Sequence, residues 1–160
     1  MHNLKFKKIF NFSSSTFHHQ RGQSLFELIV AIAISALIVV AVVSLAVNSI
    51  KNSNFSKNKA LASSYAQQAT EWLRGERDSN FAAFRAHVED STENTRCLNN
   101  LVWTINPCGT VTMDGTPFKR EVVFRFSDSD TVIKAEITVS WTDSGGLHEV
   151  KSSTNFSDWQ

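Results

Sequence analysis

The chain has 160 residues, the length of one ordinary domain with at most a small appendage. Its 16 basic and 15 acidic residues nearly cancel, so the overall charge gives no support to a broadly basic nucleic-acid-binding protein. A hydrophobic content of 42% argues against wholesale disorder, and two cysteines are too few for a disulfide-rich scaffold or a four-cysteine zinc site.

The most informative segment is an uninterrupted apolar run over residues 25–47, in which Glu27 is the only charged residue. A helix of these 23 residues is roughly 34 Å long, enough to cross a hydrocarbon core of about 30 Å. The run has no polar face of helical period, which excludes an amphipathic helix on the membrane surface. A buried core helix is the alternative, but the run exceeds what a chain of this size normally buries. The sequence therefore predicts a transmembrane helix.

The segment before the apolar run is a basic leader that ends in Gly22. It carries four basic residues and no acidic residue (Lys5, Lys7, Lys8 and Arg21). A secretory signal peptide places its apolar region before the cleavage site, and here the order is reversed. A cut after Gly22 would remove residues 1–22 and leave the apolar helix on the mature protein.

The junction reads GQSLFE over residues 22–27 and continues directly into the apolar run. This pattern resembles the class III signal of type IV prepilins and type II secretion pseudopilins. The resemblance implies that a prepilin peptidase cuts between Gly22 and Gln23 and methylates the new amine of Gln23. Glu27 then becomes the fifth mature residue, where the family has a glutamate used in subunit assembly. The absence of Pro and Gly from the run favours a minor subunit.

Glu27 also has a physical interpretation that is independent of the family. A carboxylate at the bilayer centre costs about 2.5–3.5 kcal/mol on insertion scales, so an intramembrane acid predicts a functional role. Since Glu27 lies near the start of the run, its side chain can instead extend to the membrane interface. Cleavage creates a cation at Gln23, which is available to Glu27 within one subunit or, as the resemblance implies, between neighbouring subunits.

The resemblance also implies partners and a location. The partners are other pilin or pseudopilin subunits, the prepilin peptidase, the assembly platform in the inner membrane and the lipid bilayer. Nucleic acid is a partner only if the chain belongs to a DNA-uptake pseudopilus, and no cofactor is implied. The expected topology is a single pass with a cytoplasmic N-terminus and an extracytoplasmic C-terminal domain. Charge supports it only weakly, because Lys51, Lys57 and Lys59 follow the run.

Helical periodicity continues beyond the apolar run. Apolar residues recur at three- and four-residue steps between residues 61 and 73, and the linker before them has no Pro or Gly. This pattern predicts one long helix over residues 23–77, with Gly75 marking its end. Asp78 and Ser79 are then expected to cap a short second helix that carries Phe81, Phe84 and Val88.

The C-terminal part of the chain has the period of β-strands. Alternation predicts strands over residues 118–126, 133–141 and 147–156, and a shorter one over 101–105. Polar turns at 127–130 and 143–146 imply antiparallel pairing. We therefore expect an α+β fold in which the long helix packs on a small antiparallel sheet, with residues 78–160 as the globular domain. This layout is also that of the pilin family.

The remaining candidate sites are few. Ten residues separate Cys97 from Cys108, and export to an oxidising compartment favours a disulfide over two free thiols or half a metal site. Asp128 and Asp130 lack the other spaced acids of an EF-hand, which favours a polar turn over a calcium site.

No phosphate-binding glycine loop, His-Glu-x-x-His run or serine nucleophile elbow is present in the sequence. The sequence therefore predicts a structural subunit and not an enzyme. The alternative is a membrane-tethered extracytoplasmic binding domain that is neither cleaved nor polymerised.

Overall fold

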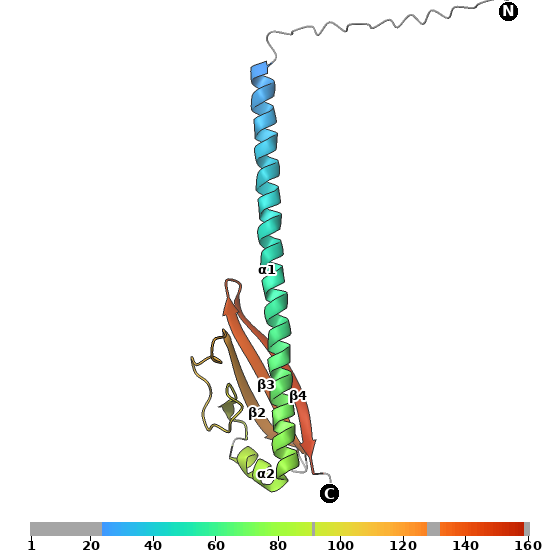
Figure 1. The fold of residues 1–160 in the computed structure, drawn as a ribbon, viewed down its shortest axis with the longest axis vertical. Helices are drawn as coiled ribbons and strands as arrows, with labels where there is room; N and C mark the ends of the chain where they lie inside the picture. The colour runs from blue at the N-terminus through green and yellow to red at the C-terminus, as the bar shows by residue number, and fades with distance from the viewer. Residues whose placement is uncertain (1–23, 91, 128–131, 159–160) are drawn as a thin grey trace, which may run out of the picture. The chain divides into compact units, whose positions relative to one another are not determined.

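The computed structural model describes residues 24–90, 92–127 and 132–158, which form two helices and four strands (Figure 1). The elements are α1 (Ser24–Ser79), α2 (Phe81–Glu89), β1 (Thr95–Cys97), β2 (Phe118–Phe126), β3 (Val132–Asp143) and β4 (Gly146–Ser157). The chain divides into two compact units at Asn48. The apolar beginning of α1 and the domain that starts at Ser49 are therefore described separately.

The four strands form one antiparallel sheet in the order β1-β2-β3-β4. Within β2 and β3, buried side chains alternate with more exposed ones, as expected for a sheet with one covered face. Phe124 pairs with Ala135, and Ile133 pairs with Phe156, so the apolar positions of adjacent strands share that face. The predicted α+β class and the three longer predicted strands are confirmed.

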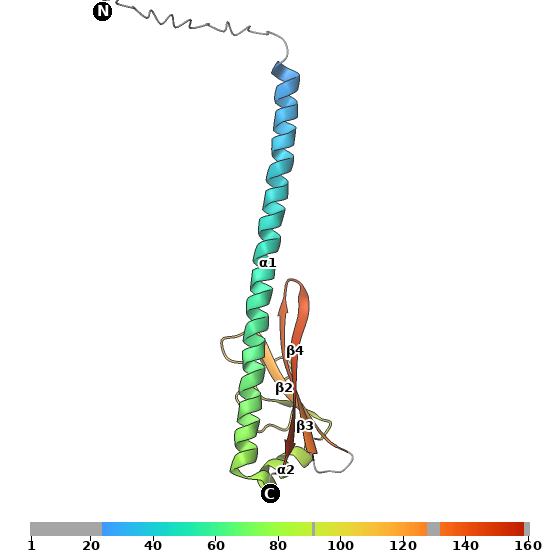
Figure 2. The same cartoon turned by 90° about the vertical axis from the view of Figure 1, so that its right-hand side faces the viewer.

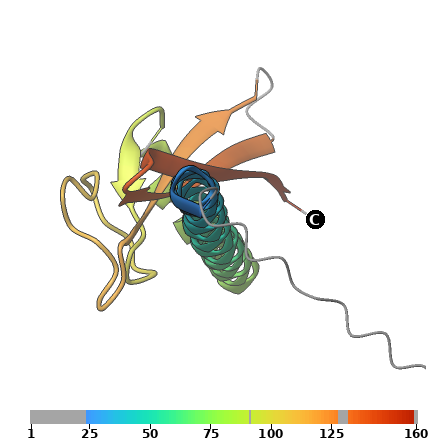
Figure 3. The ribbon, with the colours of Figure 1, turned by 90° about the horizontal axis from the view of Figure 1, so that it is seen from above.

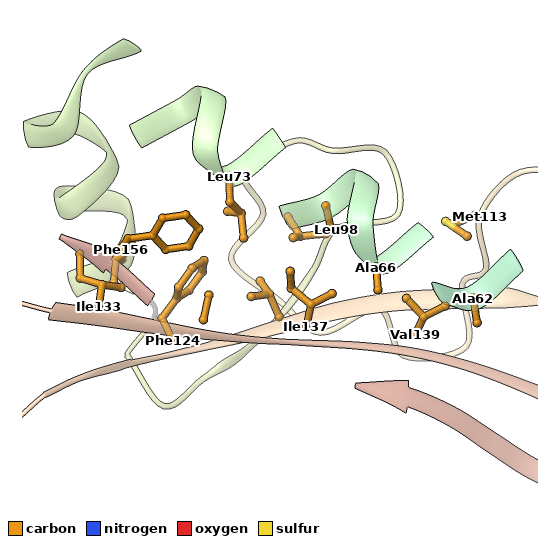
Figure 4. Packing of buried hydrophobic residues seen from close by; sticks show 14 of the residues in the cluster. Ala62, Ala66, Leu73, Leu98, Met113, Phe124, Ile133, Ile137, Val139 and Phe156 are labelled. Carbon is orange, nitrogen blue, oxygen red and sulfur yellow. The ribbon is translucent and has the colours of Figure 1, made fainter. Parts of the chain in front are cut away.

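The second half of α1 covers the apolar face of the sheet (Figure 2). Ala62, Ala66, Ala69 and Leu73 are at most 1% exposed and recur at three- and four-residue steps. In Figure 4 the labelled members of this row point toward Ile137 and its neighbours on the strands. Because alanine side chains are short, the helix backbone lies close to the sheet. The predicted role of residues 61–73 as its cover is confirmed.

The junction between the two helices differs from the prediction. Helix α1 does not end at Gly75 but continues to Ser79, whose hydroxyl donates to the carbonyl of Glu76 in the last turn (2.9 Å). The N-cap of α2 is therefore Asn80 and not Asp78 or Ser79. Asn80 has an extended backbone (φ −161°), and its side-chain oxygen accepts a hydrogen bond from the amide of Ala83 (3.0 Å).

Helix α2 closes one end of the core with an aromatic cluster. The ring of Phe84 lies 5.3 Å from that of Phe156 and 6.3 Å from that of Phe124, both in edge-on arrangements. All three side chains are at most 1% exposed. Phe84 and Val88, predicted as core residues of a short helix, are buried there as expected.

The strand predicted over residues 101–105 is wrong, and the short first strand is Thr95–Cys97 instead. Leu101 has a positive φ of 52°, which breaks an extended run. The following residues bond to other parts of the domain: Trp103 Nε1 donates to Glu76 Oε2 (2.9 Å) and Thr104 Oγ1 donates to the carbonyl of Cys97 (2.6 Å). Figure 3 shows the connection between β1 and β2 as loops that extend beside the sheet.

This connection is closed by the predicted disulfide between Cys97 and Cys108. Cys97 ends β1, and the backbone amide of Cys108 donates to Glu121 Oε1 on β2 (2.9 Å). The bond therefore fixes the beginning of the loop against the sheet.

Replacing both cysteines by serine is expected to destabilise the domain by roughly 3 kcal/mol, because the unfolded chain regains the freedom of a short closed loop. Chemical denaturation of the full chain, followed by tryptophan fluorescence, measures the change.

The corresponding test on the wild type is thiol alkylation without reductant, which should label neither cysteine. Labelling of both in freshly isolated membranes would contradict the disulfide.

Candidate functional site

The first candidate site is the apolar half of α1. Its large side chains are exposed over the whole run, for example Leu25 (72%), Leu37 (71%) and Leu45 (70%). By length and composition α1 is able to cross a membrane, its most apolar part has a mean hydropathy of 3.1, and none of that part is buried. This apolar half is therefore not a buried core helix. A membrane span and an N-terminal signal sequence share these properties, and they differ in where the chain is cut.

Glu27 lies in the first turn of α1, which begins at Ser24. Its side chain is exposed and forms no ion pair with any residue that the structure describes. A carboxylate in the first turn interacts favourably with the helix dipole, but in an apolar environment it still requires a cation. Gly22 and Gln23, the predicted cleavage and methylation positions, lie outside the described residues.

Within the domain, a second feature is the buried guanidinium of Arg120, which is 2% exposed. Its three nitrogens donate to main-chain carbonyls: Nε to Leu98 (3.0 Å), Nη1 to Tyr65 (2.9 Å) and Nη2 to Asn99 (3.1 Å). Burial lowers the pKa of Arg120, but a guanidinium stays protonated at neutral pH. Arg120 thus ties α1, the β1–β2 loop and β2 together.

Replacing Arg120 by Met is expected to reduce the free energy of unfolding by about 2–4 kcal/mol, because buried carbonyls lose their donors. Arg120→Lys should recover little of it, since one ammonium cannot reproduce the planar fork. Arg125→Met is the matched control: Arg125 is on the same strand, and its ion pair with Glu136 is half-exposed and contributes under about 1 kcal/mol. Equal effects at both positions would contradict the assigned role.

A third feature is the contact between α1 and the β3–β4 turn. The Phe55 ring lies 5.1 Å from that of His148 and 6.1 Å from that of Trp141. Asp143 Oδ1 accepts a hydrogen bond from the amide of Gly145 (2.7 Å) and lies 2.9 Å from His148 Nε2. The Gly145 hydrogen bond, followed by that of His148, lowers the pKa of Asp143.

This lowered pKa predicts acid sensitivity. A carboxyl group whose pKa is lower in the folded state stabilises the fold above its unfolded pKa of about 3.9, and this contribution is lost as the pH falls through the folded value. Thermal unfolding midpoints at pH 6 and pH 3 should therefore differ less in Asp143→Asn than in the wild type. Asp158→Asn is the control, and it should retain the wild-type difference. An unchanged pH dependence in Asp143→Asn would contradict this assignment.

Within the part of the chain that the structure describes, no three His, Cys, Asp or Glu side chains lie close enough together to hold a metal ion. Asp128 and Asp130, predicted to form a polar turn, lie outside the described residues. Cys97 and Cys108 are bonded to each other and are therefore not metal ligands.

The sequence interpretation missed two of these features. Arg120 occupied a position of the apolar strand face between Phe118 and Val122, and a charged residue on that face was a usable signal for a buried, multiply bonded side chain. The contact between Phe55 and His148 had no comparable signal, because it depends on how far along α1 the β3–β4 turn reaches.

The comparisons with known proteins bear on the beginning of the chain. Residues 17–43 match the family model of the prokaryotic N-terminal methylation motif, which includes the proposed cleavage junction, Glu27 and most of the apolar run. The match is consistent with a type IV pilin or pseudopilin precursor. Comparisons with curated proteins and with solved structures found no match.

Proposed function

We propose that this chain, which carries the prokaryotic N-terminal methylation motif, is the precursor of a structural, non-enzymatic subunit of a type IV pilus or related pseudopilus. The motif and the apolar helix together fit a protein anchored in the inner membrane. In the proposal, prepilin peptidase cuts between Gly22 and Gln23 and methylates the amine of Gln23. The C-terminal domain then lies outside the cytoplasm.

The observation that carries the proposal is where the motif match lies on the chain. The match spans residues 17–43, so it includes the proposed cut after Gly22 and continues along the exposed apolar half of α1. A cut there leaves a new amine at Gln23, four residues before Glu27, the one carboxylate of the apolar run. Removal of a signal sequence would instead discard the apolar helix.

The physical basis of assembly is an exchange of environments for the apolar half of α1. In the membrane its side chains contact lipid, and in a filament they contact the same helix of neighbouring subunits. The hydrophobic gain from this exchange is small, because both environments are apolar. Glu27 of one subunit and the amine of Gln23 of another then determine the register, since an unpaired charge in that core is costly.

The experiment that tests the proposal is the mass of the mature N-terminus, measured on protein from membranes and from sheared surface filaments. We expect a species that begins at methylated Gln23, with residues 1–22 absent. A chain that retains Met1 in every fraction would overturn the proposal and support an uncleaved tethered domain. A cut C-terminal to the apolar run would identify the segment as an ordinary signal sequence.

A further inference from the structure

The lysines that follow the apolar run have no role in the processing or assembly proposed above. Lys51 and Lys57 border a cleft of about 450 Å³ between α1 and the β3–β4 turn. Within residues 24–90, 92–127 and 132–158, neither forms an ion pair with a carboxylate, whereas Lys119 and Lys151 each do. Two ammonium groups that border one cleft and pair with no carboxylate favour an anionic ligand.

The walls of the cleft are suited to a small polar group. Asn54 and Asn58 on α1 and Ser144 on the turn contribute side chains that donate and accept hydrogen bonds. Phe55 also lines the cleft, and its ring contacts with His148 and Trp141 hold the turn against the helix. The cleft is therefore formed by two elements that are packed together.

Its position along the chain indicates where the ligand comes from. Lys51 follows the end of the proposed span, residue 47, by four residues of the sequence. Four residues reach at most about 14 Å, so the chain keeps Lys51 near the headgroup layer of one leaflet, which is roughly 5–8 Å thick. This step rests on the membrane span in the proposed function, but not on cleavage or assembly.

Asp143 restricts which anions the cleft can bind. It lines the same cleft, and its Oδ1 accepts a hydrogen bond from the amide of Gly145 and lies 2.9 Å from His148 Nε2, contacts that favour the ionised carboxylate. A carboxylate that lines the same cleft, although it pairs with neither lysine, disfavours a dianion such as inorganic phosphate. It suits a monoanionic phosphodiester that also carries a cationic amine.

We propose that the cleft between α1 and the β3–β4 turn binds the headgroup of an amine-bearing phospholipid, with Lys51 and Lys57 on the phosphodiester and Asp143 on the amine. Such a site fixes the depth and rotation of the subunit at the extracytoplasmic surface of the membrane. Because the orientation is fixed, the same face of the domain is turned toward any partner in the membrane plane.

The test uses the full chain, purified in an uncharged detergent and titrated with phosphatidylethanolamine, with bound lipid counted by native mass spectrometry. We expect one lipid per chain and a dissociation constant roughly tenfold higher in Lys57→Gln, which loses one charge-assisted contact. Lys59→Gln is the matched control, because it removes the same charge two residues away on the same helix, outside the cleft. It should change the constant less than about twofold.

Further measurements distinguish binding of the lipid headgroup from binding of other phosphate-containing ligands. Phosphatidylglycerol, which lacks the amine, should bind more weakly than phosphatidylethanolamine, and Asp143→Asn should abolish that preference. Displacement of the lipid by equimolar inorganic phosphate would overturn the proposal in favour of a free-anion site. Equal effects of Lys57→Gln and Lys59→Gln would overturn it in favour of nonspecific charge.

Failure of this proposal is distinguishable from failure of the proposed function. The titration uses unassembled protein, so loss of filaments does not affect it. A chain that does not span the membrane would be released by alkaline extraction of the membrane fraction, which is a separate measurement.

Discussion

Gly22→Val is expected to leave a full-length precursor in the membrane. A peptidase that requires the smallest residue before the cut has no room for a β-branched side chain, and steric exclusion of this kind should slow processing by on the order of 100-fold. The apolar run is untouched, so membrane insertion should be normal. The measurement is the intact mass of the membrane-extracted chain, which should retain residues 1–22 and lack the methyl group.

Two further variants make this result specific. Gly22→Ala adds a single carbon and should be processed at an intermediate rate. Gln20→Val places the same side chain two residues earlier and should be cut normally. If Gly22→Val is still shortened by 22 residues, the segment is not a class III signal.

The strands and the helix cover were predictable because burial on one face imposes a period. In β2 the alternation from Phe118 to Phe126 is uninterrupted, and in α1 the row from Ala62 to Leu73 keeps helical spacing. Both patterns are local, so they can be followed in the sequence without knowledge of the partner element. The same alternation puts Arg120 on the core face, but it does not identify the three carbonyls to which the guanidinium donates.

The loop between β1 and β2 could not be predicted in this way. Residues 101–105 have apolar character typical of a strand, but their conformation depends on distant groups such as Glu76, which accepts the Trp103 hydrogen bond. The cleft beside Lys51 has the same origin, because it exists only where the β3–β4 turn meets α1. Contacts between segments about 90 residues apart leave no periodic trace in either segment.

The candidate site at the beginning of the chain is the opposite case. The residues that define the motif are contiguous, from the basic leader through Gly22 and Glu27 to the apolar run. Such a motif can be identified from the sequence without knowledge of the fold. The proposed roles of Gly22, Gln23 and Glu27 involve a peptidase and neighbouring subunits, so they are tested by processing and assembly experiments. Of these residues, Glu27 is the one whose substitution distinguishes a filament subunit from a tethered domain.

Glu27→Leu is expected to give a processed, stable membrane protein that fails to enter filaments. Insertion should be unharmed, because the change removes an intramembrane charge. Cleavage should persist, because Gly22 remains and the bond lies five residues away. In the filament core, however, the amine of Gln23 loses its carboxylate, and an unpaired buried charge costs roughly 3–5 kcal/mol. Incorporation should therefore fall by on the order of 100-fold or more.

The measurement is the ratio of variant to wild-type subunit in sheared filaments, with the membrane fraction as reference. Ser35→Leu is the matched control, because it also replaces a polar residue of the apolar run by leucine. The hydroxyl of Ser35 donates to the carbonyl of Ala31 in its own helix (2.8 Å), so it needs no partner from another subunit. It should assemble, whereas Glu27→Gln, which keeps the shape but not the charge, should fail. Wild-type recovery of Glu27→Leu in filaments would contradict the assembly role, because a tethered domain predicts no effect from the change.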